Sequence, residues 1–212
     1  WIAVVAEALG TQMPIEECFE GDVNLEIEHS GKVKFTIDDD KGTGKLVKKD
    51  EKTVLKIEGE EMSVTLDGDT LTLDDLLGQG VNIIFGREGT DATNPENYLS
   101  EDELAVIGEW YSENVKELLD EEAQTTLDGV DNINDAMRLK FAKDRTVQVI
   151  YKGAELGTYP WSALYGYYAI EMDDEAPENV LITMEEDGSL SVQYSDEDDY
   201  LTFKCVKSAG EE

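Results

Sequence analysis

The stretch DVNLEIEHSGKVKFTID, residues 22–38, alternates apolar and polar side chains on both sides of one short turn. Before the turn the apolar residues fall at every second position, at Val23, Leu25 and Ile27. Successive side chains of a β-strand point to opposite faces of the sheet, so the pattern places one face on a core and the other in water. Gly31 in the turn favours a hairpin. We therefore predict two antiparallel, half-buried strands.

The same alternation recurs at close spacing along the first half of the chain. Turn residues separate the segments, as in the Asp-Gly-Asp of residues 67–69. With the opening WIAVVAEA, residues 1–8, the segments amount to about eight strands of ordinary length before residue 88. Pro14 suits the first turn of a short helix within residues 11–20. Residues 1–90 are predicted to form one β domain.

A polar stretch without alternation interrupts the pattern, and residues 91–104 are predicted to be a linker. Near its end, Ser100 and Glu103 have the spacing of a capping box, which predicts a short helix over residues 104–107. Alternating segments then resume. Residues 105–208 are predicted to form a second domain.

The second half repeats the organisation of the first. Trp110 opens a strand as Trp1 does, and Val115, Leu118 and Leu119 follow at helical spacing. The segment NVLITMEEDGSLSVQYS, residues 179–195, then matches the strand, Asp-Gly turn and strand of the first half. The predicted fold is all-β, with two tandem antiparallel meanders of about eight strands, each with a short helical insert after its first strand.

Such a meander can remove its exposed edges by closing into a barrel. An eight-stranded barrel has an interior that side chains just fill, or that holds one small ligand.

The step Gly108-Glu109-Trp110 resembles the Gly-x-Trp opening of lipocalin-like domains. Both halves also resemble small β-barrel domains of secreted or lipid-anchored envelope proteins of Gram-positive bacteria. The matching stretches of the first half are Trp1, GTQMPIEE, LEIEHSGKVKF and the LDGDTLTL that leads to Phe85. Its Gly-x before the Trp is missing, and the second half shares only the rhythm and the Gly-x-Trp. The resemblance implies a lipocalin-like barrel, an extracellular or envelope-anchored location and no known catalysis; it carries over no ligand residues.

The chain carries 50 acidic and 17 basic residues, for a net charge of −33. Nucleic acid and anionic lipid surfaces would be repelled, so neither is an expected partner. No apolar run approaches the roughly 18 residues that a membrane span needs. Because residue 1 is a Trp within a predicted strand, we expect that a preceding segment was removed, and that any membrane attachment runs through such an N-terminal anchor.

The sequence contains no pattern typical of a catalytic site. His29, the single histidine, lies beside a predicted turn, and Cys18 and Cys205 have no evident base. Cys205 is in register with Leu201 and Phe203, which predicts a buried thiol. We expect no cofactor and no catalytic residue. The alternative that stays open is a secreted hydrolase that acts on glycans through two carboxylates.

Acidic residues gather at predicted strand ends, around Asp38 and Asp40 and around Asp196 and Asp198. Calcium prefers such oxygen ligands, but none of these clusters has the spacing of a calcium-binding loop. We expect no firm metal site and only weak cation binding.

The segment TYPWSALYGYY, residues 158–168, holds the candidate ligand-binding residues Trp161, Tyr165 and Tyr167. Pro160 predicts a strand end or a sheet edge. Strand alternation places Tyr168 in the core and both Tyr165 and Tyr167 outside. Outward tyrosines suit stacking on a sugar or contact with a protein, or they form ordinary cross-strand pairs.

Together these features predict a non-enzymatic, extracytoplasmic binding or interaction module of a bacterial envelope lipoprotein. Its partner is a small molecule, a glycan or a protein.

Overall fold

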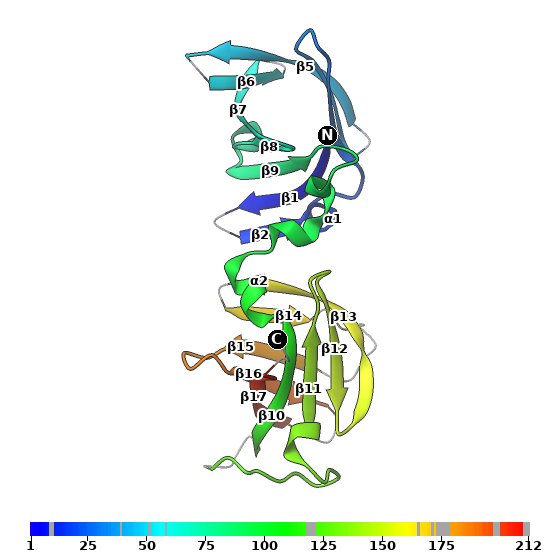
Figure 1. Cartoon of the computed structure of the whole chain (residues 1–212), viewed down its shortest axis with the longest axis vertical. Coiled ribbons are helices and arrows are strands. Elements are labelled where there is room, and N and C mark those ends of the chain that lie inside the picture. Colours follow the sequence, from blue (N-terminus) through cyan, green and yellow to red (C-terminus); the bar gives the residue numbers. More distant parts are fainter. Residues whose placement is uncertain are drawn as a thin grey trace. The chain divides into compact units, whose positions relative to one another are not determined.

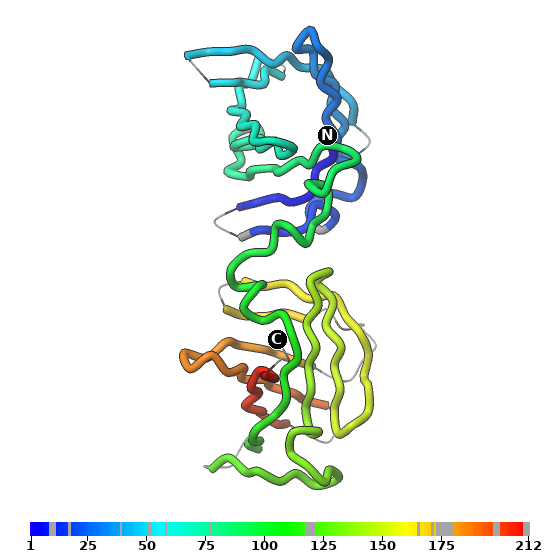
Figure 2. The backbone as a smooth tube through the Cα atoms, in the orientation of Figure 1, coloured from blue at the N-terminus to red at the C-terminus, as the bar shows by residue number. Residues whose placement is uncertain are grey.

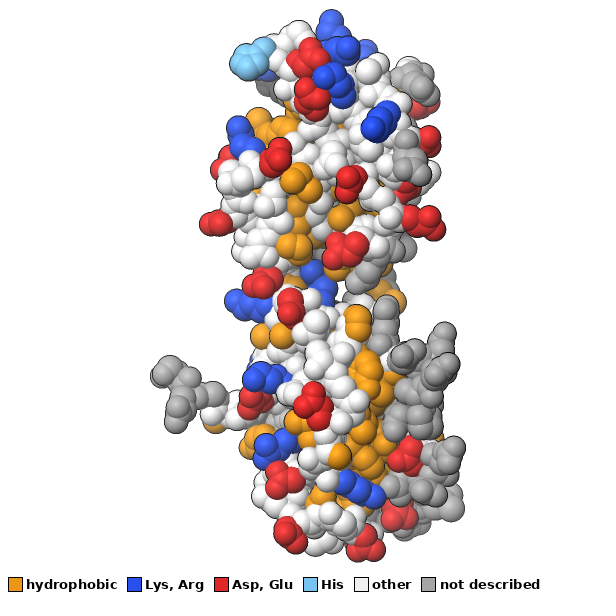
Figure 3. Space-filling model, turned by 90° about the vertical axis from the view of Figure 1, so that its right-hand side faces the viewer, with side chains coloured by type: hydrophobic (Ala, Val, Ile, Leu, Met, Phe, Trp, Pro, Cys, Tyr) orange, Lys and Arg blue, Asp and Glu red, His pale blue; other side chains and the backbone are white. Residues whose placement is uncertain are grey.

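The computed structural model describes residues 1–8, 11–38, 40–50, 52–57, 59–117, 122–164, 166–170, 172, 179–196 and 200–209 (Figures 1 and 2). The chain divides into two compact units, Trp1–Ser100 and Glu101–Glu212. Each unit is an antiparallel barrel, as the alternation predicted. Within the described residues, no helix has both the length and the apolar character needed to cross a membrane. Acidic side chains and Lys and Arg side chains are both spread over the surface in Figure 3, with a group of Lys and Arg side chains at the top of that view.

The first unit is a sheet that closes on itself. Its strand order is β2-β1-β3-β4-β5-β6-β7-β8-β9, and β1 also pairs with β9 from Ile2↔Gly86 to Ala8↔Val81. The ring therefore consists of β1 and β3–β9, with β2 added beside β1. The strands are β1 (Ile2–Ala8), β2 (Thr11–Pro14), β3 (Val23–Ile27), β4 (Lys32–Ile37), β5 (Asp40–Lys49), β6 (Lys52–Ile57), β7 (Glu60–Asp67), β8 (Thr70–Leu73) and β9 (Val81–Gly86).

The second unit is a closed barrel in which each strand pairs with its neighbours in sequence. Its first strand, β10, pairs with both β11 and the last strand, β17. The strands are β10 (Gly108–Glu117), β11 (Met137–Phe141), β12 (Thr146–Tyr151), β13 (Ala154–Leu164), β14 (Tyr167–Ile170), β15 (Asn179–Met184), β16 (Leu190–Ser195) and β17 (Tyr200–Lys207). Both barrels are thus up-and-down meanders of eight strands.

Helices are few and short. They are α1 (Ile15–Cys18), α2 (Glu101–Val106) and the 3₁₀ turns η1 (Leu76–Gly78), η2 (Asp91–Thr93), η3 (Pro95–Tyr98) and η4 (Ile133–Asp135). Helix α1 follows Pro14, where the sequence predicted a helix, and α2 is the helix predicted after Ser100. The stretch expected to be a linker contains η2, η3 and the start of α2.

The predicted helical insert of the second domain is wrong at Val115, which lies in β10 and is buried. The strand contains a bulge, because the register between β10 and β17 shifts between Ser112 and Asn114. A bulge adds one residue to a strand and reverses its alternation beyond that point. Trp110, Ser112 and Val115 are therefore all buried on the same strand. Leu118 and Leu119, the other residues of the predicted helix, lie outside the described residues.

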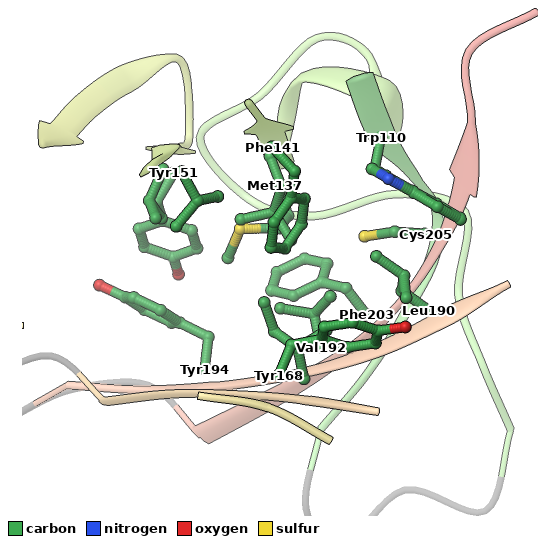
Figure 4. Close-up of a cluster of buried hydrophobic side chains, with 14 of the residues drawn as sticks. Trp110, Met137, Phe141, Tyr151, Tyr168, Leu190, Val192, Tyr194, Phe203 and Cys205 are labelled. Carbon is green, nitrogen blue, oxygen red and sulfur yellow. The ribbon is translucent and has the colours of Figure 1, made fainter. Parts of the chain in front are cut away.

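The interior of the second barrel holds several aromatic side chains packed among aliphatic ones (Figure 4). The Phe141 and Trp161 rings meet edge to face with centroids 5.2 Å apart, and the Tyr151 and Tyr194 rings lie 4.1 Å apart. Such pairs contribute about 0.5–1.5 kcal/mol beyond the burial of their area. Cys205 is buried in the same cluster, as the sequence predicted, and burial raises the pKa of its thiol.

The interior of the first barrel is aliphatic. Phe85 is the one aromatic residue among its fully buried core members. On β5 the inward positions include Gly42 and Gly44. A methyl group at Gly42 would overlap the ring of Phe35, and one at Gly44 would overlap Ile57. These glycines therefore let neighbouring side chains lie across β5.

Each barrel has the same arrangement at the seam between its first and last strands. The Arg87 guanidinium lies 4.9 Å from the Trp1 ring centroid, and the Lys207 ammonium lies 5.5 Å from that of Trp110. In each unit the tryptophan lies at or directly before the start of the first strand, and the cation ends or directly follows the last. A cation over an aromatic face contributes about 0.5–1 kcal/mol at an exposed site. The equivalence of Trp1 and Trp110 supports the internal repeat.

Helix α2 is fastened to the end of the second barrel at which β10 begins. Lys207 donates to the carbonyl oxygen of Ala105 at 2.9 Å, and Trp110 Nε1 donates to that of Val106 at 2.7 Å. Buried Arg145, in the β11–β12 turn, donates to the Glu103 carboxylate at 2.5 Å. Removing one partner of a buried ion pair is strongly destabilising, so α2 is an integral part of this unit.

Candidate functional site

The aromatic segment of residues 158–168 occupies β13 and β14. Trp161, which the sequence grouped with the exposed tyrosines, is only 1% exposed. Its ring packs on Phe141, and its Nε1 donates to the Thr146 carbonyl oxygen at 3.1 Å. With its polar atom satisfied and its ring inside the barrel, Trp161 belongs to the core and contributes nothing to an outer binding face.

Pro160 lies inside the eleven-residue strand β13 and not at a strand end, so that expectation is wrong. The strand changes partners at this point: Pro160 ends the ladder with β12, opposite Thr146, and Trp161 begins the ladder with β14, opposite Ile170. Proline has no backbone N–H to donate. Because Pro160 lies where one ladder ends and the other begins, the missing donor does not interrupt either ladder.

Tyr168 points into the barrel, as strand alternation predicted (Figure 4). Its hydroxyl donates to the Asp102 carbonyl oxygen at 3.0 Å, which also ties β14 to α2. Burial raises the pKa of Tyr168 to about 12, and the charge of Asp102 adds to the shift. Tyr168 is therefore a structural residue with a satisfied polar tip.

Tyr167 points outward and is 56% exposed. Directly opposite it on β13 lies Leu164, which is 51% exposed. One row further along, Ala169 lies opposite Leu181 of β15, which is 46% exposed. Because directly opposed residues share a face of the sheet, these four side chains form one apolar patch, here called the Tyr167 face. Tyr165 lies outside the described residues.

The sequence indicated Tyr167 but not Leu164 or Leu181. Those leucines sit on other strands, and only the register of β13, β14 and β15 brings them beside Tyr167. A one-residue slip in register would have sent them to the opposite face.

The expected cation clusters show no assembled metal site in the part of the chain that the structure describes, where no three Asp, Glu, Cys or His side chains are placed to hold an ion. Asp38 is exposed in the turn before β5, and its carboxylate accepts the Gly21 amide at 2.9 Å. Asp40 begins β5, and Asp196 accepts the Tyr194 hydroxyl at 2.9 Å. Asp198 lies outside the described residues.

Two described carboxylates have a clearly displaced pKa, and in both the pKa falls. Hydrogen bonds from Lys49 and Lys56 lower the pKa of Glu61 to about 2. Contact with Lys204 and then with Ser189 lowers that of Asp187. A general acid in glycoside hydrolysis needs a raised pKa, so neither carboxylate suits that role.

Comparison with known proteins gives no family. No model of a known protein family matches the chain, and no curated protein matches it significantly. The chain is similar to a crystal structure of a protein of unknown function from the DUF3598 family of Nostoc punctiforme, with 12% identity and a TM-score of 0.28. That similarity covers 97% of this chain and 93% of the other. At this TM-score it supports no argument about function.

Because Tyr168 faces the core and Tyr167 faces outward, replacing each with Ala should lower the unfolding free energy by very different amounts. Tyr168→Ala removes a buried ring and should cost roughly 3–5 kcal/mol of unfolding free energy, whereas Tyr167→Ala should cost about 1 kcal/mol or less. Tyr168→Phe keeps the ring but leaves the Asp102 carbonyl without its donor, and should cost about 1 kcal/mol. Urea unfolding of the three variants measures these values. If Tyr167→Ala lowered the unfolding free energy more than Tyr168→Ala does, Tyr167 would be the buried residue and Tyr168 the exposed one.

Proposed function

We propose that this chain is a non-enzymatic, extracytoplasmic binding module built from two lipocalin-like barrels, and that the Tyr167 face contacts a protein partner. The observation that carries the proposal is the exposure of Tyr167 directly opposite Leu164, with exposed Leu181 one row further along on β15. Large apolar side chains are normally exposed singly, and a contiguous group on three neighbouring strands marks an interaction surface.

The composition of the Tyr167 face favours a protein over a glycan. Exposed Leu164, Ala169 and Leu181 give aliphatic area beside the one aromatic ring, whereas the polar neighbours in register, Thr183 and Ser162, are less exposed. A sugar platform pairs aromatic rings with polar groups, whereas protein interfaces combine tyrosine with apolar side chains at their centre and leave charge to the rim. No charged residue belongs to the Tyr167 face itself, although the chain carries 50 acidic residues.

The proposed location is the cell envelope or the exterior of a bacterium, by attachment through an N-terminal anchor. Its support is the resemblance of the Trp strand and Gly-x-Trp step to envelope lipoprotein domains, together with a net charge of −33 that keeps the chain away from nucleic acid and anionic lipid. Attachment through an anchor leaves both barrels available for binding.

A matched pair of variants tests the Tyr167 face. Leu164→Ser with Tyr167→Ser removes the patch, and Leu104→Ser with Tyr200→Ser removes an equally exposed Leu and Tyr elsewhere in the same unit. The immobilised parent chain is used to capture proteins from an envelope extract. Each captured protein is purified, and its affinity for the parent and for both variants is measured. The patch variant should bind at least about tenfold more weakly than the parent, and the control variant within about twofold.

Equal binding by the parent and both variants would exclude the Tyr167 face as a protein contact. A glycan array probed with the same three proteins tests whether the Tyr167 face binds a carbohydrate instead. Glycan binding by the parent that is lost only in the patch variant would replace the protein partner with a carbohydrate.

A second candidate function lies in the first barrel, where a small apolar molecule would bind in the interior. Inward residues near its ends, among them Ile27, Leu46 and Ile57, remain partly accessible, and Leu66 is 60% exposed. The interior of the second barrel, which holds several aromatic side chains, leaves its core members buried. Barrels of eight strands have similar interiors, so fewer large side chains in the first leave more room for a ligand.

An uncharged, environment-sensitive dye such as Nile red tests this second candidate. Leu46→Trp fills the interior, and Val47→Trp places the same ring on the outer surface of the same strand. Dye fluorescence should fall at least several-fold in the first variant and remain close to the parent level in the second. Equal fluorescence from all three proteins would show that the dye does not enter the barrel.

A further inference from the structure

The lysines of the first unit are concentrated on three adjacent strands. All eight lysines of residues 1–100 lie between Lys32 and Lys56, on β4, β5 and β6. Elsewhere in these hundred residues Arg87 is the one Lys or Arg, among many acids. The charge is thus segregated, with a locally positive region on a chain of net charge −33.

Seven of these lysines share the outer face of the sheet. They alternate with inward residues such as Val33 and Leu55, which are buried in the core. All seven are exposed, and together they are called the lysine face: Lys32, Lys34, Lys41, Lys45, Lys49, Lys52 and Lys56.

The register places like charges directly opposite one another on this face. Lys45 lies between Lys32 on one side and Lys56 on the other. Lys49 lies opposite Lys52 in the β5–β6 hairpin. Neighbouring strands are only about 4.8 Å apart, and like charges in directly opposed positions destabilise a sheet. The arrangement therefore costs folding stability in the absence of a counter-charge.

Part of the lysine face already shows how a carboxylate is held. Glu61 on β7 accepts from Lys49 at 2.8 Å with one oxygen and from Lys56 at 2.6 Å with the other. Lys34 pairs with Glu26 at 3.0 Å and with Glu28 at 3.6 Å. Among the described residues, the other four members, Lys32, Lys41, Lys45 and Lys52, form no ion pair. The opposed pair of Lys32 and Lys45 thus offers two donors without a bridging carboxylate.

We propose that the lysine face binds an acidic segment of a partner protein, whose Asp or Glu side chains bridge neighbouring lysines as Glu61 bridges Lys49 and Lys56. This surface is separate from the Tyr167 face, lies on the other unit and does not depend on the function proposed there. Complementary charge across an interface gives specificity and fast association, and each bridging carboxylate also relieves the repulsion between opposed lysines.

Two features of the lysine face favour a carboxylate partner over a phosphate surface. It contains no arginine, the residue whose planar fork matches phosphate oxygens with two parallel hydrogen bonds. It also lacks an exposed aromatic or large aliphatic side chain that would insert into a lipid surface, since Val54 on the same face is buried. A short acidic segment further brings less charge than a polymer or membrane, and so meets less repulsion from the rest of this chain.

A charge-reversal pair tests the proposal on the full chain. Lys45→Glu places a carboxylate between Lys32 and Lys56, and Lys52→Glu places one opposite Lys49. Lys116→Glu with Lys143→Glu gives the same change of net charge on the second unit. The probe is a fluorescein-labelled poly-glutamate peptide, followed by anisotropy at physiological ionic strength. The parent should bind, the first variant should bind at least about tenfold more weakly, and the control variant within about twofold.

Stability separates loss of binding from loss of fold. Because Lys45→Glu with Lys52→Glu replaces like-charge contacts by ion pairs, its melting temperature should rise above that of the parent while its binding falls. No binding by the parent, or an equal loss in both variants, would overturn the proposal. So would binding of polyphosphate or of phosphatidylglycerol vesicles, dependent on the same lysines, without binding of poly-glutamate.

Discussion

The pairing of the first strand with the last is the constraint on which each barrel depends. β1 pairs with β9, and β10 pairs with β17, so neither sheet is left with an open ladder along these strands. In both barrels the seam contains a bulge in the first strand, and a tryptophan at the start of that strand lies beside a basic side chain at the end of the last. The bulge increases the local twist that closure requires. The contact between the cation and the ring joins the start of the first strand to the end of the last strand of each barrel.

Alternation in the sequence was enough to predict the all-β fold, the two meanders and the opposite facing of Tyr167 and Tyr168. It failed where tertiary pairing changed the local pattern. Val115 appeared helical from its spacing with Leu118 and Leu119, whereas pairing with β17 across a bulge keeps it in β10. Pro160 appeared to end a strand because its position between two ladders depends on both β12 and β14. The Tyr167 face and the opposed lysines were likewise hidden, because register between strands decides which residues become neighbours.

The two closed barrels differ in what fills their interiors and in what their outer surfaces carry. In the second, aromatic and aliphatic side chains fill the interior, and α2 covers one end through Tyr168, Trp110, Lys207 and Arg145. Its proposed contacts are consequently on the outside, at the Tyr167 face. In the first, aliphatic side chains and inward glycines leave several apolar residues partly accessible, and the outer surface carries the lysine face. Similar backbones can thus present different surfaces, since a fold by itself does not determine function.

Native-state hydrogen exchange of the backbone amides tests closure most directly. If both seams are closed, amides of β1, β9, β10 and β17 that face their seam partners should exchange as slowly as those of the interior pair β11 and β12, through opening of the whole barrel. Exchange of the seam amides at the rate of exposed loops, with β11 and β12 still protected, would show open sheets and contradict the account of both barrels.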